Sequence, residues 1–517
     1  MIFTEQNIKS QQISFKEFLT SSKKNKIFFL LASLAILLQL VIFKYLYPYP
    51  SFIYGDSFSY LKAAYENLDI NTYMIGYSRF LRFFSVFTTS DTALVSFTYI
   101  SIQLSSLFLL LTLFYFYRPG KVVQTILLCF VIFSPLSLHL ANLISSDGIF
   151  VGLSLIWFAL LIWIIHRPSK QIILAHTIVL FTAFTVRYNA LIYPFISALA
   201  FFISRMPVKE KLVGLGFGVL LCASFVFYTS FKYKQVSGHW QYSPFSGWQL
   251  ANNAMYAYKY VDSVERKPMP KNLERLDQMT RQYYDASRNE HPHPQEYVPV
   301  STIYMWTPFL PLWRYTNNRF KSDTTATDIK KWASMGPLYK EYGLQIIKRY
   351  PLYFARYFLW PNAQKYYAPP VEYLGEYNSG QDSASFFGRV WFQYKSPKVY
   401  TRVKGKEVRI VNFYPILFGC INVVMLCVLV CYAALQGWKQ KGNFRTGILM
   451  GSTVWLLNAG FTIFASSAAL RFQSFPLMLT TIFTVFLVEW LWTVAFAKET
   501  VAKQIVPIEE TMEKAMA

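Results

Sequence analysis

Repeated apolar runs of about bilayer length are the feature that most restricts how this chain folds. A helix that crosses the hydrocarbon core of a membrane needs about 20 mostly apolar residues. Only 15% of the residues are charged and 54% are hydrophobic, whereas soluble domains carry about a quarter charged residues. The sequence therefore predicts an α-helical polytopic membrane protein with about ten transmembrane helices. The predicted spans are residues 27–48, 92–117, 122–140, 148–166, 171–187, 190–204, 212–231, 410–436, 446–466 and 473–496.

The distribution of lysine and arginine predicts how these spans are oriented. The amino-terminal tail and the turns RPGK, HRPSK, RMPVKEK and KQKGNFR are basic, and with ten spans all of them fall on one side. Short basic loops are retained in the cytoplasm. The loop 49–91, the turns NLISSDG, RYN and SSAALRF, and the long segment 232–409 then lie outside. The formal charge of +23 indicates membrane lipids and phosphates as partners, with no nucleic acid.

Three regions follow from this topology. Residues 1–231 form an amino-terminal transmembrane core of about seven spans, with an acidic first external loop at 49–91. Residues 232–409 form a large extracytoplasmic region with interfacial, amphipathic helices, among them the stretch YGLQIIKRYPLYFARYFLWPN, kinked or started at Pro351. Residues 410–517 form a carboxy-terminal bundle of about three spans and a cytoplasmic tail. All five cysteines fall inside apolar spans, so no disulfide framework is predicted.

Two acids at predicted outer helix ends are candidates for chemistry. Asp56, in YGDSFSYL, is suited to act as a general base that takes a proton from an acceptor hydroxyl. Asp147, in LISSDGIF, lies where an ionisable group is costly unless it is paired or used. The alternative for both is helix capping, since an acid suits the amino terminus of a helix. For Asp56 the two roles are compatible.

Four arginines on the same predicted face are candidates for binding a substrate. Arg187, in VRYN, and Arg471, in ALRF, stand between apolar runs, and a planar guanidinium is suited to a phosphate. The alternative is that they extend to lipid head groups. Arg79 and Arg82, in GYSRFLRFF, follow Asp56 on a second interfacial helix and are weaker candidates.

Other types of site find little support in the sequence. His291 and His293 have no cysteine or carboxylate at ligand spacing, so we expect no metal site there. The chain has no glycine-rich phosphate loop followed by lysine and no G-x-S-x-G motif. We therefore expect neither direct use of a nucleoside triphosphate nor serine hydrolase chemistry.

The order and common sidedness of these motifs resemble the GT-C superfamily of integral membrane glycosyltransferases. The nearest members in this respect are the protein O-mannosyltransferases, the aminoarabinose transferases of lipid A and the RgtA/B/C/D-like proteins. YGDSFSYLKAA resembles their acidic first external loop, SSDGIFVGLSL the acidic turn before the fourth span, VRYNALIYP an Arg-x-Asn turn, and LRFQSFPLML their arginine-aromatic turn. The likeness is best over the first ~210 residues.

The resemblance implies roles for individual residues. Asp56 would be the catalytic base and Asp147 the second acid, while Arg187 and Arg471 would hold a lipid phosphate. Tyr60, Tyr188 and Asn189 are included as substrate contacts beside them, together with Arg79 and Arg82. Asp56 is followed by Ser57, where many relatives have a second acid, so a mechanism without a cofactor or metal is favoured over one that uses a divalent metal.

The implied activity is transfer of a sugar from a polyprenyl-phosphate donor to an acceptor hydroxyl of a lipid, glycan or protein, with inversion, at the extracytoplasmic face of a bacterial inner membrane. Two alternatives remain open. One is an undecaprenyl-diphosphate glycan polymerase or ligase, for which Asp56 would matter little. The other is a non-catalytic transporter, although transporters usually show inverted repeats and ionisable groups near the middle of the bilayer.

Overall fold

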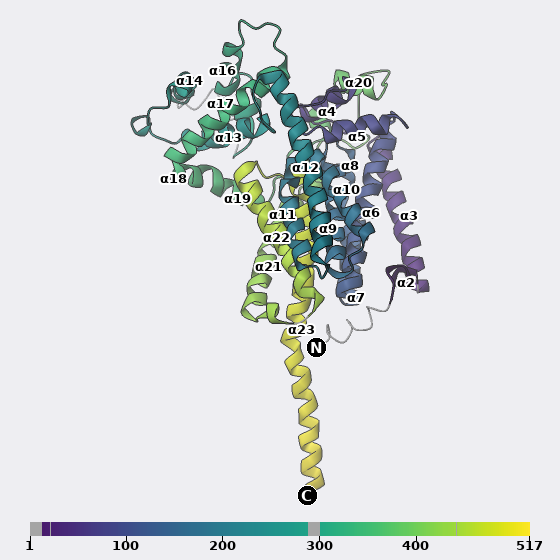
Figure 1. Ribbon diagram of the computed structural model, residues 1–517. Helices are drawn as coiled ribbons and strands as arrows, with labels where there is room; N and C mark the ends of the chain where they lie inside the picture. The colour runs from purple at the N-terminus through teal and green to yellow at the C-terminus, as the bar shows by residue number, and fades with distance from the viewer. Residues whose placement is uncertain (1–12, 21, 288–299, 441, 517) are drawn as a thin grey trace.

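The computed structural model describes residues 13–20, 22–287, 300–440 and 442–516, and it describes the side chains of all of these except 286, 287 and 497–516. These residues are almost entirely helical, and they contain isolated β-bridges but no β-strand. A long helical bundle carries a second, smaller group of helices at one of its ends (Figure 1).

Ten helices or helix pairs of the bundle match the ten predicted spans. Eight of those in the described residues are long and apolar enough to cross a membrane, which indicates an integral membrane protein. The other two, Lys170–Val186 and Tyr188–Ile203, are shorter apolar helices and correspond to the fifth and sixth predictions. The helices are α3 (Lys23–Leu46), α6 (Asp91–Tyr117), α7 (Lys121–Ile132) with α8 (Pro135–Asn142), α9 (Asp147–His166), α10 (Lys170–Val186), α11 (Tyr193–Ile203), α12 (Val208–Ser237), α21 (Tyr414–Ala434), α22 (Asn443–Ala465) and α23 (Leu470–Met516).

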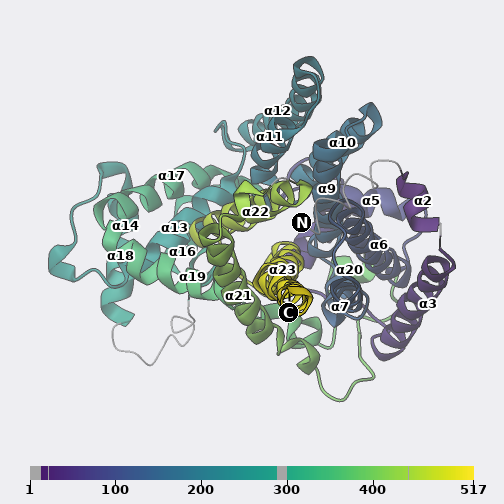
Figure 2. The ribbon, with the colours of Figure 1, turned by 90° about the horizontal axis from the view of Figure 1, so that it is seen from below.

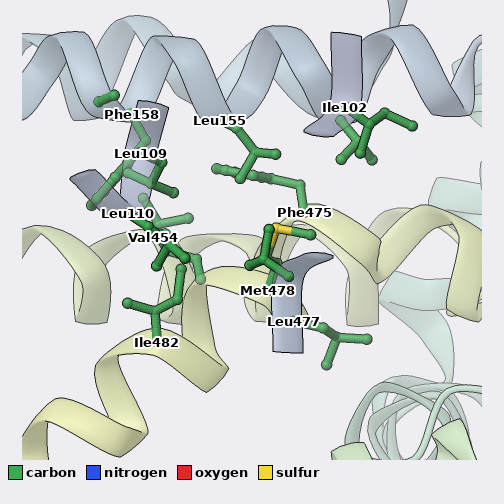
Figure 3. Close-up of a cluster of buried hydrophobic side chains, with 14 of the residues drawn as sticks. Ile102, Leu109, Leu110, Leu155, Phe158, Val454, Phe475, Leu477, Met478 and Ile482 are labelled. Atoms are coloured by element: carbon green, nitrogen blue, oxygen red, sulfur yellow. The ribbon is translucent and has the colours of Figure 1, made fainter. Parts of the chain in front are cut away.

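The first part of helix α23 lies at the centre of the bundle, and the rest extends beyond it (Figure 1). It packs against α7, α9, α21 and α22, and the view along the bundle shows it surrounded by them (Figure 2). Leu155 and Phe158 of α9 face Phe475, Met478 and Ile482 of α23 across an apolar core (Figure 3). This packing fixes the position of the residues at the start of α23.

The helices run alternately up and down, which places two groups of helix ends at opposite ends of the bundle. One end, called the site end here, holds the carboxyl ends of α3, α10, α12 and α22 and the amino ends of α6, α9, α21 and α23 (Figure 1). The basic turns that predict a cytoplasmic location all lie at the other end, called the basic end.

The third predicted span is broken between α7 and α8. Pro135 is the first residue of α8, where its missing N–H costs nothing. The hydroxyl of Tyr414 on α21 lies 2.9 Å from Ser134 Oγ and accepts the backbone N–H of Leu136 at 3.3 Å. Gln39 of α3 donates to the free carbonyl of Ile132. Neighbouring helices thus satisfy the polar groups that the break releases, as a break inside a bilayer requires.

The smaller group of helices belongs to the long segment 232–409. Its main helices are α13 (Pro244–Tyr258) and α17 (Asp328–Arg349), which cross closely at Gly247. A Cβ atom added there would lie 2.0 Å from the carbonyl oxygen of Gly336, so only glycine fits. The pair encloses a separate apolar core rich in tryptophan and tyrosine. The other elements are α14 (Lys271–Ser287), α15 (Ile303–Trp306), α16 (Pro311–Arg319), α18 (Pro351–Phe354), a π-helical turn (Ala355–Leu359), α19 (Trp360–Tyr367) and α20 (Phe386–Trp391).

The predicted amphipathic helix of this segment needs a correction. Residues 342–349 are the end of α17, and Tyr342 and Ile346 are buried in the core of the segment rather than facing a membrane surface. A new helix does begin at Pro351, as its fixed φ favours. Only this second part leaves large hydrophobic side chains exposed, namely Leu352 and Trp360.

Candidate functional site

Four charged residues that are distant in the sequence meet at the site end. Nη1 of Arg471 lies 2.8 Å from a carboxylate oxygen of Asp56 and 3.3 Å from one of Asp147. The other oxygen of Asp147 pairs with Nη1 of Arg187. We call Asp56, Asp147, Arg187 and Arg471 the charged cluster. It brings together four residues that the sequence analysis singled out separately. The two negative charges of the acids equal the two positive charges of the arginines.

The residues of the charged cluster differ in exposure. The side chains of Asp147 and Arg471 are only 1% and 6% exposed, whereas those of Asp56 and Arg187 are 19% and 15% exposed. Buried charges persist in proteins when they are paired, because desolvation of an unpaired ion costs several kcal/mol. The inner pair therefore anchors the site, and the outer pair remains accessible to a substrate.

The loop after α3 and the turn before α9 are joined to each other, which brings the two acids together. Ser51 exchanges backbone hydrogen bonds with the turn, accepting from Ile144 and donating to Asn142. The hydroxyl of Ser57 donates to the carbonyl of Ile144 at 2.7 Å and accepts from the backbone N–H of Ile53. Ser57 therefore connects the loop that carries Asp56 to the turn that carries Asp147.

Neither acid caps its helix, so that prediction is wrong. Helix α4 (Asp56–Tyr65) begins with Gly55 as its N-cap, at φ +87°, and the cap makes no side-chain hydrogen bond. Asp56 is the first helical residue, and its oxygens are used by Arg471 and Tyr73. Asp147 is likewise the first residue of α9, after Ser146. Both carboxylates are still stabilised by their place at the amino end of a helix, where the helix dipole is positive.

The guanidinium of Arg471 is held between two aromatic rings. Its central carbon lies 4.3 Å from the ring centroid of Phe472 and 5.0 Å from that of Tyr373. The Phe472 ring also lies 4.8 Å from the guanidinium of Arg187. Nε of Arg471 is buried and has no hydrogen-bond partner among the described residues. One ring thus contacts both arginines, and Nε of Arg471 is a buried donor whose hydrogen-bonding capacity no described residue satisfies.

Two tyrosines complete the surroundings of the acids. The hydroxyl of Tyr73, in the loop 49–91, donates to Asp56 at 2.6 Å. Burial raises the pKa of Tyr73 well above its ordinary value and the charge of Asp56 adds to this, so the hydroxyl keeps its proton. Tyr60, a predicted substrate contact, lies beneath Tyr73 and bonds with Ser146 at 3.0 Å. Ser146 also accepts from Arg187.

Asn362 of α19 fixes the turn that precedes Arg471. Its amide nitrogen donates to the carbonyl of Thr462 at 3.1 Å and of Ile463 at 2.9 Å, and also to that of Ser466. Its amide oxygen accepts the backbone N–H of Ala468 at 3.0 Å. The turn between α22 and α23 is therefore built around a side chain of the long segment.

Glu372 is a charged neighbour that the sequence analysis missed. It has a left-handed backbone at φ +47°, uncommon for a residue with a Cβ atom, and Arg471 and Lys365 lie close enough to affect its charge. Burial in the surrounding protein raises the pKa of its carboxyl, and the two bases oppose that shift. Burial lowers the pKa of Lys365, and Glu372 opposes this.

The remaining predicted contacts lie around the charged cluster and not in it. Arg79, on α5 (Gly76–Ser85), pairs with Asp69 at 2.9 Å, and Arg82 donates to the carbonyl of Ala64. Both therefore bind their own loop. Tyr188 packs on Phe245 of α13, and Asn189 follows it in a half-buried 3-10 turn.

Two predictions concern metals and thiols. His291 and His293 lie outside the described residues. Within those residues, no group of three or more His, Cys, Asp and Glu side chains is arranged to hold a metal ion. All five cysteines are free thiols.

Comparisons with models of known protein families, with curated proteins and with solved structures found no match for this chain. What defines the site is therefore its own geometry: a paired, partly accessible charged cluster at one end of a bundle of apolar helices.

Proposed function

We propose that the protein is a membrane glycosyltransferase of the GT-C type. It transfers a sugar from a polyprenyl phosphate to an acceptor hydroxyl, with inversion, at the extracytoplasmic face of a bacterial inner membrane. The observation that carries this proposal is the contact of Arg471 Nη1 with both Asp56 and Asp147. It puts a candidate base, two arginines and the free Nε of Arg471 at one place, where the bundle meets the long segment.

The arginines stabilise the leaving group. When the bond between the anomeric carbon and the phosphate oxygen breaks, the lipid phosphate departs as an anion and needs positive charge nearby. Arg187 and Arg471 supply that charge, and Phe472 keeps both guanidinium groups in place. A phosphate leaving group needs no general acid.

Donor binding also frees Asp56. In the free protein one carboxylate oxygen of Asp56 is paired with Nη1 of Arg471 at 2.8 Å. A phosphate that binds Arg471 competes for this ion pair and releases that oxygen for the acceptor hydroxyl. Asp56 then takes the proton of the acceptor hydroxyl while the acceptor oxygen attacks the anomeric carbon from the side opposite the phosphate.

Asp147 has a positioning role in this scheme. It is almost fully buried and binds both arginines, so it holds them for the phosphate instead of reacting itself. Ser145, whose hydroxyl donates to Asp147 at 2.7 Å, fixes the carboxylate further.

The activity is tested with protein in liposomes that contain radiolabelled polyprenyl-phosphate sugars and an extract of envelope glycolipids and glycans. Wild-type protein should transfer label to the extract. Asp56→Asn should lower the rate about 10²- to 10⁴-fold, the usual contribution of a general base. Asp69→Asn, in the same loop but outside the charged cluster, is the matched control and should retain the rate.

Each other outcome has a defined meaning. Equal rates for Asp56→Asn and wild type would refute the base and favour the polymerase alternative. Solute uptake into the vesicles without transfer of sugar would favour a transporter. We expect EDTA to leave the rate unchanged, and loss of activity that Mg²⁺ or Mn²⁺ restores would contradict the metal-free mechanism.

Sidedness is tested by labelling whole cells. Tyr54, two residues before Asp56, is 86% exposed. In a protein without its native cysteines, Tyr54→Cys should react with a membrane-impermeant maleimide added outside, while Arg445→Cys at the basic end should react only after lysis. The reverse pattern would put the site in the cytoplasm, where flipped lipid-linked donors are absent.

A further inference from the structure

Three tryptophans of the long segment form a stack that is open at one end. The indole rings of Trp248 and Trp332 are 4.3 Å apart and nearly parallel at 9°, and those of Trp332 and Trp306 are 5.1 Å apart at 7°. Trp248 and Trp332 are 0% and 2% exposed, whereas Trp306 is 36% exposed. Hence an aromatic surface of the segment remains in contact with solvent at Trp306.

The open end of the stack lies beside the charged cluster. The ring of Tyr73 is 5.7 Å from that of Trp306, and the Tyr73 hydroxyl donates to Asp56. The ring of Phe245 lies 6.1 Å from both Tyr73 and Trp306. A single tyrosine therefore separates the exposed indole from the carboxylate proposed as the base.

The stack is held rigidly by hydrogen bonds. The indole N–H of Trp248 donates to the carbonyl of Trp332 at 2.9 Å, and that of Trp313 donates to the carbonyl of Met305 at 2.8 Å. Trp306 follows Met305 in α15, so its backbone is fixed as well. A preorganised aromatic surface loses little entropy when a ligand binds.

Trp306 combines an apolar ring with a free polar group. In the described part of the chain, its indole N–H has no hydrogen-bond partner, unlike those of Trp248 and Trp313. A pyranose ring has a matching character, with C–H groups on one face and hydroxyls around its rim. Ligand sites typically unite aromatic surface with a few polar groups in this way.

We infer that Trp306, Tyr73 and Phe245 form a subsite for a sugar ring of the acceptor, so that the acceptor is a glycan or glycolipid and not a protein hydroxyl. The inference rests on the proposed function, because it takes Asp56 as the base that receives the acceptor proton. The sugar stacks on the indole while one of its hydroxyls reaches Asp56.

Binding is measured without turnover, by saturation-transfer NMR on protein in lipid nanodiscs without donor. The probes are the methyl glycosides of glucose, galactose and mannose. At least one should receive saturation at its ring protons from wild-type protein. Trp306→Ala should weaken that binding about 5- to 10-fold, whereas Trp306→Phe, which keeps a ring, should retain most of it. Trp240→Ala is the matched control, because Trp240 is also exposed but packs on Phe227.

Three results would overturn the inference: no binding of any probe to wild-type protein, equal binding to wild type and Trp306→Ala, or an equal loss in Trp240→Ala. A serine- and threonine-containing peptide that binds through Trp306 in place of the glycosides would also overturn it, and would indicate a protein acceptor.

Failure of this inference can be distinguished from failure of the proposed function. Asp56→Asn should abolish transfer yet still bind the glycoside. If sugar binding at Trp306 is found and no transfer occurs, the proposed function fails. If transfer occurs and Trp306→Ala leaves the acceptor KM unchanged, only the subsite fails.

Discussion

The two ends of the bundle use arginine in different ways. At the basic end, residues such as Arg445 are exposed and bind a nearby carbonyl, here that of Trp438. At the site end, Arg471 and Arg187 are largely buried, paired with carboxylates and stacked on Phe472. Arginine is therefore solvated at one end of the bundle and part of a buried network of charges at the other.

Arg471→Met should have the largest effect on stability. It leaves Asp56 without its arginine and removes one of the two arginines paired with buried Asp147, so we expect the free energy of unfolding to fall by about 3–5 kcal/mol. Arg445→Met, the matched change at the basic end, should stay within about 0.5 kcal/mol. The measurement is thermal unfolding in detergent, and equal shifts for the two variants would show that the ends do not differ.

Asp147→Asn should have the second-largest effect on stability. It removes the negative charge that is paired with both arginines, so we expect the free energy of unfolding to fall by about 2–3 kcal/mol. Its matched control is Asp69→Asn, which breaks exposed pairs with Arg79 and Lys232 and should cost less than about 1 kcal/mol. The same unfolding assay applies. If Asp147→Asn lowered the free energy of unfolding as little as Asp69→Asn does, burial would not make an ion pair more important for stability.

Gly55→Ala and Gly216→Ala should change stability in opposite directions. Gly55 has φ +87°, so alanine there is strained and should cost about 1 kcal/mol although the space beside it is open. Gly216 lies within α12, toward the basic end, and alanine should stabilise that helix by up to about 1 kcal/mol. Stabilisation by Gly55→Ala would show that the turn before Asp56 is not constrained.

Glu372→Gln should give the smallest effect, visible as a change in pH dependence. The pKa of Glu372 is higher in the folded protein than the ordinary 4.5, so the folded state binds the extra proton. That contribution to stability is complete below pH 4.5 and is lost as the pH rises through the folded pKa. As the pH rises from 4.5 through the folded pKa, the Tm of the variant should therefore fall less than that of wild type. The measurement is Tm as a function of pH. Glu407→Gln, which affects an exposed pair with Arg409, is the control, and parallel curves for Glu372→Gln and wild type would refute the shift.

Much of the fold could be predicted because apolar length is a direct signal. Eight of the ten predicted spans coincide with helices of membrane-crossing length, and the break at Pro135 follows from proline chemistry. The prediction of an interfacial helix was partly wrong because the alternation of apolar and basic residues over 342–349 is the same for a helix that faces a membrane and for one that faces the core of the long segment.

The charged residues of the site could be predicted because each stands within or beside an apolar run of the sequence. Asp56, Asp147, Arg187 and Arg471 each interrupt or border an apolar run, and burial of such groups demands partners, so their meeting follows from the same physics. Tyr73, Phe472 and Trp306 gave no comparable signal, because aromatic residues are abundant throughout this chain. Glu372 lies in a turn with a left-handed backbone. Tertiary contacts determine this conformation, so the local sequence does not predict it.

The hold of Asn362 on the turn before α23 has a mechanical consequence. The side-chain amide of Asn362 joins α19 to the backbone of Thr462, Ile463, Ser466 and Ala468, and the last of these stands three residues ahead of Arg471. A displacement of α19 would therefore also shift the turn that leads into Arg471. In the proposed reaction, this joins the position of the long segment to that of the guanidinium that binds the donor phosphate.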